Sequence, residues 1–282
     1  KEMFYWRYQT IVNHVIPPVD EVIGEHKDAQ DPDVDFQLAA VEERAGLGGD
    51  ALRVDMLKSL VSFKEKIVQS KGLVLFGTPA PAGGSAFWGR GPSKTTVLVG
   101  LSGLAALRDD PRWAELFAKL GVSFVAVDAA DPVFAEAGLS EEGRKMVESL
   151  GKASLVLVAR GLSPAQAKAL LESAKKPVLL VMDALPEKGV LELVKKTESV
   201  VGLLTAEREG AAAYVKRLDE AKQALGSEYV AIVNREDLWE KAGRDEMLGV
   251  IGELLKLNYE PGDLANLFSG SLQRALSRAV QP

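Results

Sequence analysis

Polar and charged side chains follow a series of apolar runs in the last two-thirds of this sequence. They are Ser102, Asp128, Arg160, Asp183, Glu207 and the run Arg235, Glu236 and Asp237. If the runs are parallel strands of one barrel, their carboxyl ends meet at the rim where barrel enzymes do their chemistry. Two carboxylates there could act as the acid and base of a glycosidase. Ion pairs among the same side chains would instead make an inert polar rim, which is what we expect.

Histidine and cysteine limit the chemistry further. The chain has two histidines, His14 and His26, and no cysteine. A histidine-rich metal centre, a histidine base late in the chain, a thiolate nucleophile and a disulfide therefore all lack the necessary residues. We expect His26 to be solvated, because it lies in a polar run.

Two motifs come close to known patterns but miss a required residue. The segment GRGPSKTT (89–96) has Ser93 where a phosphate-binding loop needs its second glycine, and it precedes a strand instead of following one. The segment GLSGL (100–104) has Leu104 where a nucleophile elbow needs its final glycine, and no histidine occurs later as a base. Neither segment predicts a nucleotide or hydrolase site.

Composition limits the partners of the chain. Its 34 Lys and Arg against 40 Asp and Glu give a net charge of −6, which argues against nucleic-acid binding by a basic face. No window approaches the roughly 20 apolar residues of a membrane span. We therefore expect a soluble protein, with a cytoplasmic location favoured. Export after signal cleavage stays open, because the sequence starts at Lys1.

The elements that would position the polar side chains repeat in a strand and helix rhythm. Nearly continuous apolar runs, typical of parallel strands covered on both faces, lie at 95–101, 122–127, 154–159, 177–182, 199–204 and 228–233. Helical stretches lie between them, and two begin at Ser140 and at Ser163 with Pro164. Such alternation without a glycine-rich phosphate turn favours a closed (β/α)₈ TIM barrel of the α/β class.

The first ninety residues are less regular. Residues 3–12 predict a strand, 34–46 and 51–71 predict helices, and 73–76 predict a short strand. Residues 78–94 are rich in Pro, Gly and Ala and predict a surface loop. We interpret residues 1–282 as a single barrel domain that contains this loop.

Four segments resemble the membrane (renal) dipeptidase family, the M19 metallopeptidases. They are AGLSEEGRKMVESLG, SLVLVARGLSPAQAKALLESAKKPVLLVMDA, EYVAIVNREDLWEK and LNYEPGDLANLFSGSLQRAL, the last with a Gly-x-x-x-Arg tail at Gly270 and Arg274. The resemblance extends from about Val97 to Leu276. It implies a metallo-dependent-hydrolase-like barrel in which the first β/α unit is incomplete or rebuilt, with residues 3–12 matching the family's second strand.

The resemblance also implies what the strand ends should carry. The family hydrolyses dipeptides with two zinc ions held by histidines and carboxylates. The matching positions here are Ser102 for the bridging carboxylate, Arg160 and Met182 for two histidines, and Arg235 for the acid after the last strand. A loose match of His14 to the first histidine would place Ile16 at its acidic partner.

These replacements remove zinc chemistry. A catalytic zinc takes at least three N, O or S ligands, and the guanidinium group has no lone pair to donate. We therefore expect a metal-free chain without a cofactor. Ion pairs of Arg160 and Arg235 with Asp183 and Glu236 would close the old cavity, and this is the reading we favour. The alternative is a pocket for a small carboxylate formed by the same four residues.

Aromatic side chains suggest a role in binding. Candidate partner surfaces are Phe4, Tyr5, Trp6 and Tyr8 near the start and Phe87 with Trp88 in the 78–94 loop. A covered strand face and a pinned turn would explain the same residues. The leading hypothesis is a catalytically inactive dipeptidase-like barrel that acts as a binding or assembly subunit, with a protein partner or as a homodimer, since family members commonly form dimers.

Two other functions stay open. One is an enzyme of altered chemistry that uses rim carboxylates such as Asp128, Asp183 or Glu236. The other is an active zinc dipeptidase whose ligands our alignment misplaces.

Overall fold

The computed structural model describes residues 12–13, 18–19, 22, 36–76, 95–108, 110, 112–135, 138–205, 210–234 and 241–280. Within these ranges, nine strands form one sheet, and all of its pairs are parallel. Eight of them follow one another in chain order: β1 (Val12–Asn13), β2 (Phe36–Val41), β4 (Thr95–Ser102), β5 (Val122–Asp128), β8 (Val156–Arg160), β9 (Val178–Met182), β10 (Val200–Leu204) and β11 (Val230–Val233). The ninth, β3 (Leu73–Leu75), pairs with the start of β4. This is the strand order of a (β/α)₈ barrel.

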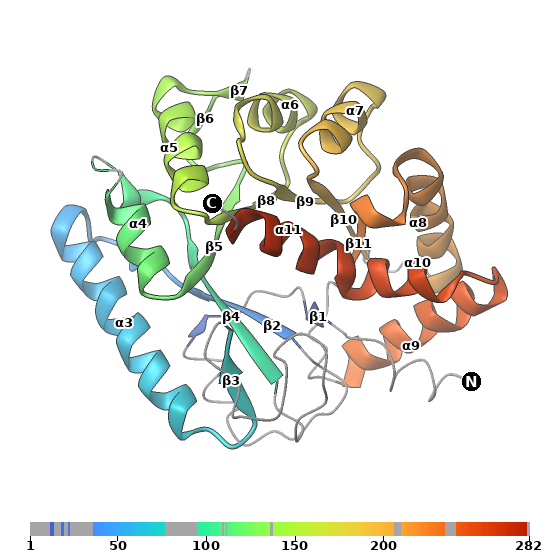
Figure 1. The fold of residues 1–282 in the computed structure, drawn as a ribbon, viewed down its shortest axis with the longest axis horizontal. Helices are drawn as coiled ribbons and strands as arrows, with labels where there is room; N and C mark the ends of the chain where they lie inside the picture. The colour runs from blue at the N-terminus through green and yellow to red at the C-terminus, as the bar shows by residue number, and fades with distance from the viewer. Residues whose placement is uncertain are drawn as a thin grey trace.

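Helices surround the sheet (Figure 1). The strands from β2 onward are followed in turn by α3 (Gly49–Gln69), α4 (Arg112–Lys119), α5 (Glu141–Lys152), α6 (Pro164–Ser173), α7 (Lys188–Lys196), α8 (Ala211–Leu225) and α9 (Lys241–Lys256). Smaller elements are the 3₁₀ turns η1 (Ala105–Leu107) and η2 (Ser227–Tyr229), the β6 (Phe134–Ala135) and β7 (Gly138–Leu139) hairpin, and the closing α10 (Pro261–Ala265), η3 (Asn266–Gly270) and α11 (Ser271–Val280). No helix in the described ranges is long and apolar enough to cross a membrane.

The predicted barrel class is confirmed, and so are the six strands predicted between residues 95 and 233. Each is buried along nearly its whole length, which explains its continuous apolar sequence. The predicted starts of two helices, at Ser140 and Ser163, are also confirmed. The Ser140 hydroxyl accepts a hydrogen bond from the Gly143 amide at 3.0 Å. Ser163 and Gln166 form a reciprocal capping box at α6.

Two predictions for the N-terminal part were wrong. Residues 34–46 do not form a helix, because Phe36–Val41 is the buried strand β2, which pairs with β4 over six residues. Pairing with neighbouring strands satisfies its backbone groups and overrides the local helical preference. The second strand of the barrel is therefore β2 and not residues 3–12. The structure places β1 in the first position of the strand order.

The closing helix α11 covers the end of the barrel at which the strands begin (Figure 1). Its Leu272, Ala275 and Leu276 belong to the same buried cluster as inward-facing strand residues such as Leu98 and Phe124. The Ser271 hydroxyl binds the Val230 carbonyl at 2.9 Å, just where β11 begins. Burial of α11 closes this end, so chemistry or binding in the barrel is left to the rim at the carboxyl ends of the strands.

Candidate functional site

Three of the residues predicted to match the family's metal-ligand positions lie on the carboxyl rim. Ser102, Arg160 and Met182 are the last residues of β4, β8 and β9, and each is half-buried. Of the other predicted site residues, Asp183 is described and exposed. The remainder lie outside the described residues, as do His14, His26, Glu207, Asp237 and the 78–94 loop; they are Arg235, Glu236, Phe4, Tyr5, Trp6, Tyr8, Phe87 and Trp88.

Charged residues from four neighbouring strand ends interact electrostatically with Asp131. We call this set the rim cluster: Glu43 after β2, Arg108 after β4, Asp128 and Asp131 at and after β5, and Arg160 at the end of β8. Sequence analysis missed Glu43, Arg108 and Asp131. The stretch that contains Glu43 was predicted as helix, and the other two lie several residues beyond their strands.

Glu43 holds the turn that follows β4. Its Oε1 accepts a hydrogen bond from the Ala105 amide at 2.6 Å. Gly103 has a φ of +86°, and a Cβ at this position would lie 2.7 Å from the Glu43 carboxyl carbon, so the close approach requires glycine. Burial raises the pKa of Glu43, and hydrogen bonds from the Ala105 and Ala106 amides partly offset that rise.

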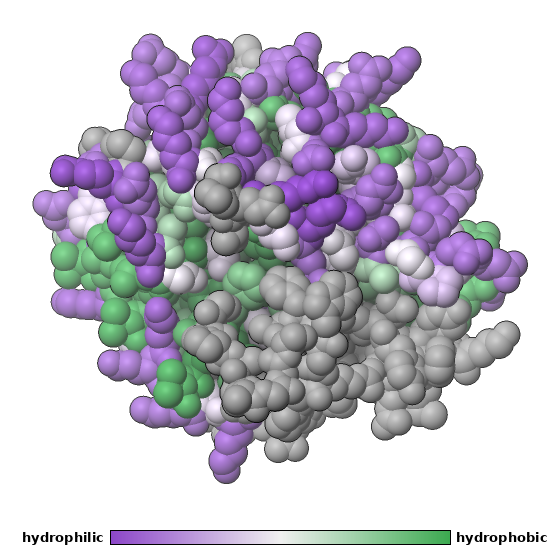
Figure 2. All heavy atoms as spheres, viewed as in Figure 1, coloured by the Kyte–Doolittle hydropathy of each residue, from purple (hydrophilic) through white to green (hydrophobic). Residues whose placement is uncertain are grey.

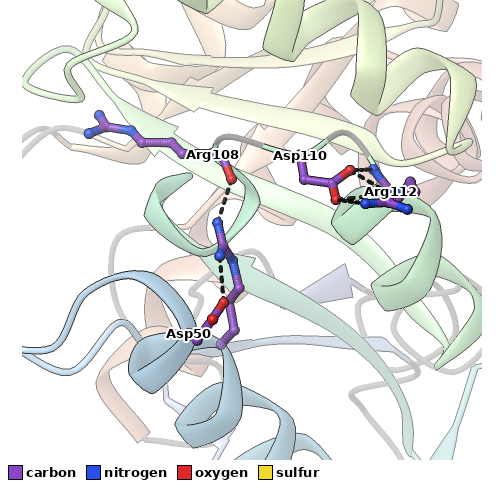
Figure 3. A network of polar contacts seen from close by, with 5 residues as sticks. Asp50, Arg108, Asp110 and Arg112 are labelled. Carbon is purple, nitrogen blue, oxygen red and sulfur yellow. Dashed lines mark hydrogen bonds and ion pairs between the residues drawn. The ribbon is translucent and has the colours of Figure 1, made fainter.

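Arg53 of α3 holds the other side of the same turn (Figure 3). Its Nε donates to the Ala106 carbonyl at 3.0 Å and its Nη2 to the Arg108 carbonyl at 2.5 Å. The guanidinium also pairs with Asp50 at 2.9 Å and lies over the Trp113 ring. A carboxylate on the amides and a guanidinium on the carbonyls therefore fix η1 from both sides. The Arg108 side chain extends away from Asp50 (Figure 3).

The loop after β5 carries the second half-buried carboxyl group, Asp131. Asp128 accepts a hydrogen bond from the Ala130 amide at 2.9 Å. Gln166 of α6 donates to the Ala129 and Ala135 carbonyls, both at 3.4 Å, and so ties this loop to the next helix. Burial raises the pKa of Asp131, the negative charge of Asp128 raises it further, and Arg108 and Arg160 lower it.

The charge of Asp131 acts on Glu43. The negative charge of Asp131 raises the pKa of Glu43, while Arg108 lowers the pKa of both. The Arg108 Nε is buried without a hydrogen-bond partner among the described atoms, but it forms an ion pair with the Glu142 carboxylate at 3.7 Å. The cluster can thus hold a proton on a carboxyl group or offer guanidinium donors to a carboxylate. In the described part of the chain, no three His, Asp or Glu side chains are arranged to hold a metal ion.

Arg160 has acidic neighbours that the sequence analysis did not expect. We predicted Asp183, which follows the next strand. The structure aligns Arg160 with Asp128 in the β5 and β8 register, and its charge acts on Asp131. Asp183 is exposed, and its carbonyl accepts a hydrogen bond from Arg217 at 2.5 Å. At least part of the acidic surroundings of Arg160 therefore comes from β5.

Replacing Asp131 with Asn should lower the pKa of Glu43, because the variant removes a nearby negative charge. Carbon-detected NMR titration of the Glu43 carboxyl would measure the change. Asp245→Asn, an exposed change on α9, serves as the control and should leave that pKa where it is. An unchanged Glu43 pKa in Asp131→Asn would show that the two carboxyl groups do not interact.

The same variant has a pH-dependent effect on stability. The folded pKa of Asp131 lies above its ordinary value of 3.8. Its stabilising contribution is therefore complete below that value and is lost as the pH rises through the folded pKa. Urea unfolding should show the stability of Asp131→Asn improving relative to the parent chain across this pH range and staying level above it.

The fold is similar to that of solved hydrolases. An amidohydrolase from Pseudomonas aeruginosa aligns with a TM-score of 0.75 and 13% identity over 99% of both chains. The probable dipeptidase PvdM from the same organism aligns with a TM-score of 0.74 and 13% identity, over 99% of this chain and 97% of that one. The dipeptidase AC, a metallopeptidase of family M19, aligns with a TM-score of 0.71 and 13% identity, over 96% of this chain and 98% of that one.

No family model matches the sequence, and no curated protein is significantly similar to it. At 13% identity the similarity concerns the fold alone. The resemblance to the M19 family is confirmed at the level of the fold. The chain has the (β/α)₈ barrel fold that M19 dipeptidases and related amidohydrolases share.

Proposed function

We propose that this chain is a dipeptidase-type barrel without dipeptidase activity, which serves as a binding or assembly subunit. The chief support is the chemistry of the strand ends. Ser102, Arg160 and Met182 supply a hydroxyl, a guanidinium and a thioether at positions where the family binds zinc. Arg160 has a fixed positive charge that acts on Asp131, so it takes over the neutralising role of a cation and supplies no ligand to one.

Zinc content tests this proposal. The purified chain is incubated with excess zinc, dialysed and analysed by mass spectrometry, and dipeptide hydrolysis is assayed in parallel. We expect far less than one zinc per chain and no hydrolysis. A variant with His14→Ala and His26→Ala shows how much residual zinc the histidines hold. One bound zinc per chain that depends on His14, or measurable hydrolysis, would instead support the active dipeptidase.

The rim cluster supports a small carboxylate as one ligand of this subunit. Arg108 and Arg160 both act on Asp131. The Arg108 Nε makes no hydrogen bond among the described atoms but forms an ion pair with Glu142 at 3.7 Å, so Arg160 is the main candidate for binding a carboxylate. Guanidinium groups bind carboxylates through paired hydrogen bonds. Calorimetric titration with dipeptides and dicarboxylates should give a heat that is lost in Arg160→Ala and kept in Arg44→Ala, which alters an exposed arginine. The absence of heat with every compound would contradict a carboxylate site.

A second candidate function is an enzyme that uses rim carboxyl groups. The raised pKa values of Glu43 and Asp131 favour it, because an acid catalyst needs a carboxyl group that keeps its proton nearer to neutral pH. Screening of dipeptides, lactones and glycosides tests this function, with Asp131→Asn as the inactive control. A turnover that Asp131→Asn abolishes would support it, and a flat screen would contradict it.

A further inference from the structure

A cavity of about 620 Å³ lies at the end of the barrel where the strands begin, opposite the rim cluster. Its lining comes from residues within 171–177, residues within 193–198 and Arg278, and we call it the α6–α7 cavity. The helices α6 and α7 end here, and α11 contacts the residues that follow them (Figure 1). Sites for small molecules commonly have volumes of about 300–1,000 Å³, so the α6–α7 cavity has the size to hold one.

The α6–α7 cavity is rich in positive charge, although the chain as a whole has a net charge of −6. Four cationic side chains from three parts of the fold line it together with two carboxylates. The cations are Lys175, Lys176, Lys196 and Arg278, and the carboxylates are Glu172 and Glu198. Figure 2 shows that hydrophilic side chains cover the upper part of this face, where Figure 1 places α6 and α7. A recess whose charges are mostly of one sign attracts ligands of the opposite sign.

The last turn of α7 already has donors for its carbonyl groups. Backbone amides that follow the helix bond to the carbonyls of residues 193–195. The Thr197 hydroxyl adds a second hydrogen bond to the Leu193 carbonyl at 2.8 Å. Lys175 and Lys196 are exposed, and neither makes a hydrogen bond or ion pair with a residue that the structure describes. Both ammonium groups are therefore available to a ligand.

Arg278 is held at the α6–α7 cavity by contacts from two sides. Glu198, just beyond the end of α7, has a φ of +56°, a conformation that favours glycine. A glutamate here has a conformational cost, and its carboxylate forms an ion pair with the Arg278 guanidinium. The Lys176 Nζ donates a hydrogen bond to the Arg278 carbonyl at 3.4 Å. These contacts join the ends of α6 and α7 to α11 and keep the guanidinium in the cavity lining.

We propose that the α6–α7 cavity binds a sugar phosphate. Ammonium and guanidinium groups bind phosphate oxygens through charge-assisted hydrogen bonds. The exposed Glu172 carboxylate can accept hydrogen bonds from sugar hydroxyl groups, and Leu171 and Leu193 offer apolar contact to carbon atoms. None of the described lining residues is aromatic, so the described lining has no ring to stack on the base of a nucleotide.

Calorimetric titration with glucose 6-phosphate, glucose and inorganic phosphate tests the class of ligand. Glucose 6-phosphate should bind, and glucose should give no heat because it lacks the phosphate charge. Inorganic phosphate should bind at least about tenfold more weakly, because it cannot contact Glu172 or the apolar lining. Raising NaCl from about 0.05 M to about 0.5 M should weaken the binding, since salt screens exposed charges. Equal affinities for glucose 6-phosphate and inorganic phosphate would contradict a sugar phosphate site.

Charge reversal locates the site. Lys175→Glu and Lys196→Glu each place a negative charge in the cavity lining and should weaken glucose 6-phosphate binding at least about tenfold. Lys188→Glu is the matched control, because Lys188 lies at the other end of α7, outside the lining, with a side chain that is 91% exposed. It changes the net charge equally and should leave the affinity unaltered. No heat with glucose 6-phosphate, or losses in the cavity variants no larger than in Lys188→Glu, would overturn the proposal.

NMR spectroscopy gives a second readout of the location. Glucose 6-phosphate should shift the amide signals of Ala174 and Thr197 at the α6–α7 cavity. Shifts confined to the rim cluster would overturn the proposal. Because the cavity lies at the opposite end of the barrel, the inference goes beyond the proposed function and does not depend on it. The zinc content of the same samples tests the proposed function separately.

Discussion

Replacing Arg53 with Met is expected to lower the free energy of unfolding by about 2–5 kcal/mol, because two carbonyl groups lose their charged donor. Arg53 is 7% exposed and binds the Ala106 and Arg108 carbonyls and Asp50. Methionine keeps part of the apolar stem but leaves both carbonyls without this donor, and each unsatisfied group costs about 1–3 kcal/mol. Urea unfolding followed by circular dichroism measures the change.

Arg44→Met is the matched control for this effect. The Arg44 side chain is 72% exposed and pairs with Asp55 at 3.4 Å. Surface pairs contribute about 0–1 kcal/mol, so this variant should remain close to the parent chain. Equal losses for Arg44→Met and Arg53→Met would show that the contacts of Arg53 with η1 do not stabilise the fold. Because η1 leads directly to Arg108, we also expect Arg53→Met to alter the NMR signals of the rim cluster.

Replacing Gly100 with Ala is expected to cost about 1–3 kcal/mol through overpacking inside the barrel. A Cβ at residue 100 would lie 2.3 Å from the Phe124 ring, which is 1% exposed and has no room to move. Gly100 also lies where the register between β4 and β5 shifts. Thermal and urea unfolding measure the loss. Gly189→Ala is the control, because its Cβ would meet no atom within 4 Å.

A double-mutant cycle identifies the clash as the cause. Phe124→Leu alone should destabilise the chain by about 1–3 kcal/mol through the cavity that it leaves. The combination of Gly100→Ala with Phe124→Leu should be more stable than the sum of the single effects by about 1 kcal/mol, because the smaller side chain makes room for the methyl group. Strict additivity would mean that the ring does not limit residue 100.

Much of the barrel could be predicted because its strands are short and apolar throughout. The strands β4, β5 and β8–β11 have this character, and their turns and caps are explicit in the residues that flank them. The strand β2 was missed because six apolar and polar residues at 36–41 carry no periodicity that separates a strand from a helix. Its pairing with β1 and β4 decided the outcome.

The rim residues also divide into those that could be predicted from the sequence and those that could not. Ser102, Arg160 and Met182 were correctly expected at strand ends, because a strand end follows directly from the end of an apolar run. Glu43, Arg108 and Asp131 lie in turns whose direction depends on distant partners. Arg53 holds the turn after β4 and Gln166 holds the loop after β5, and neither contact leaves a local signal.

The sequence by itself determined which chemical groups this protein has available. Two histidines and no cysteine exclude a cysteine-ligated or histidine-rich metal centre whatever the fold. The tertiary structure alone decided which charges act on one another. Glu43 and Asp131 are 88 residues apart in the chain, yet burial raises the pKa of both and the charge of Asp131 raises that of Glu43 further. Solvent exclusion and electrostatic forces depend on distance through space, and only folding sets that distance.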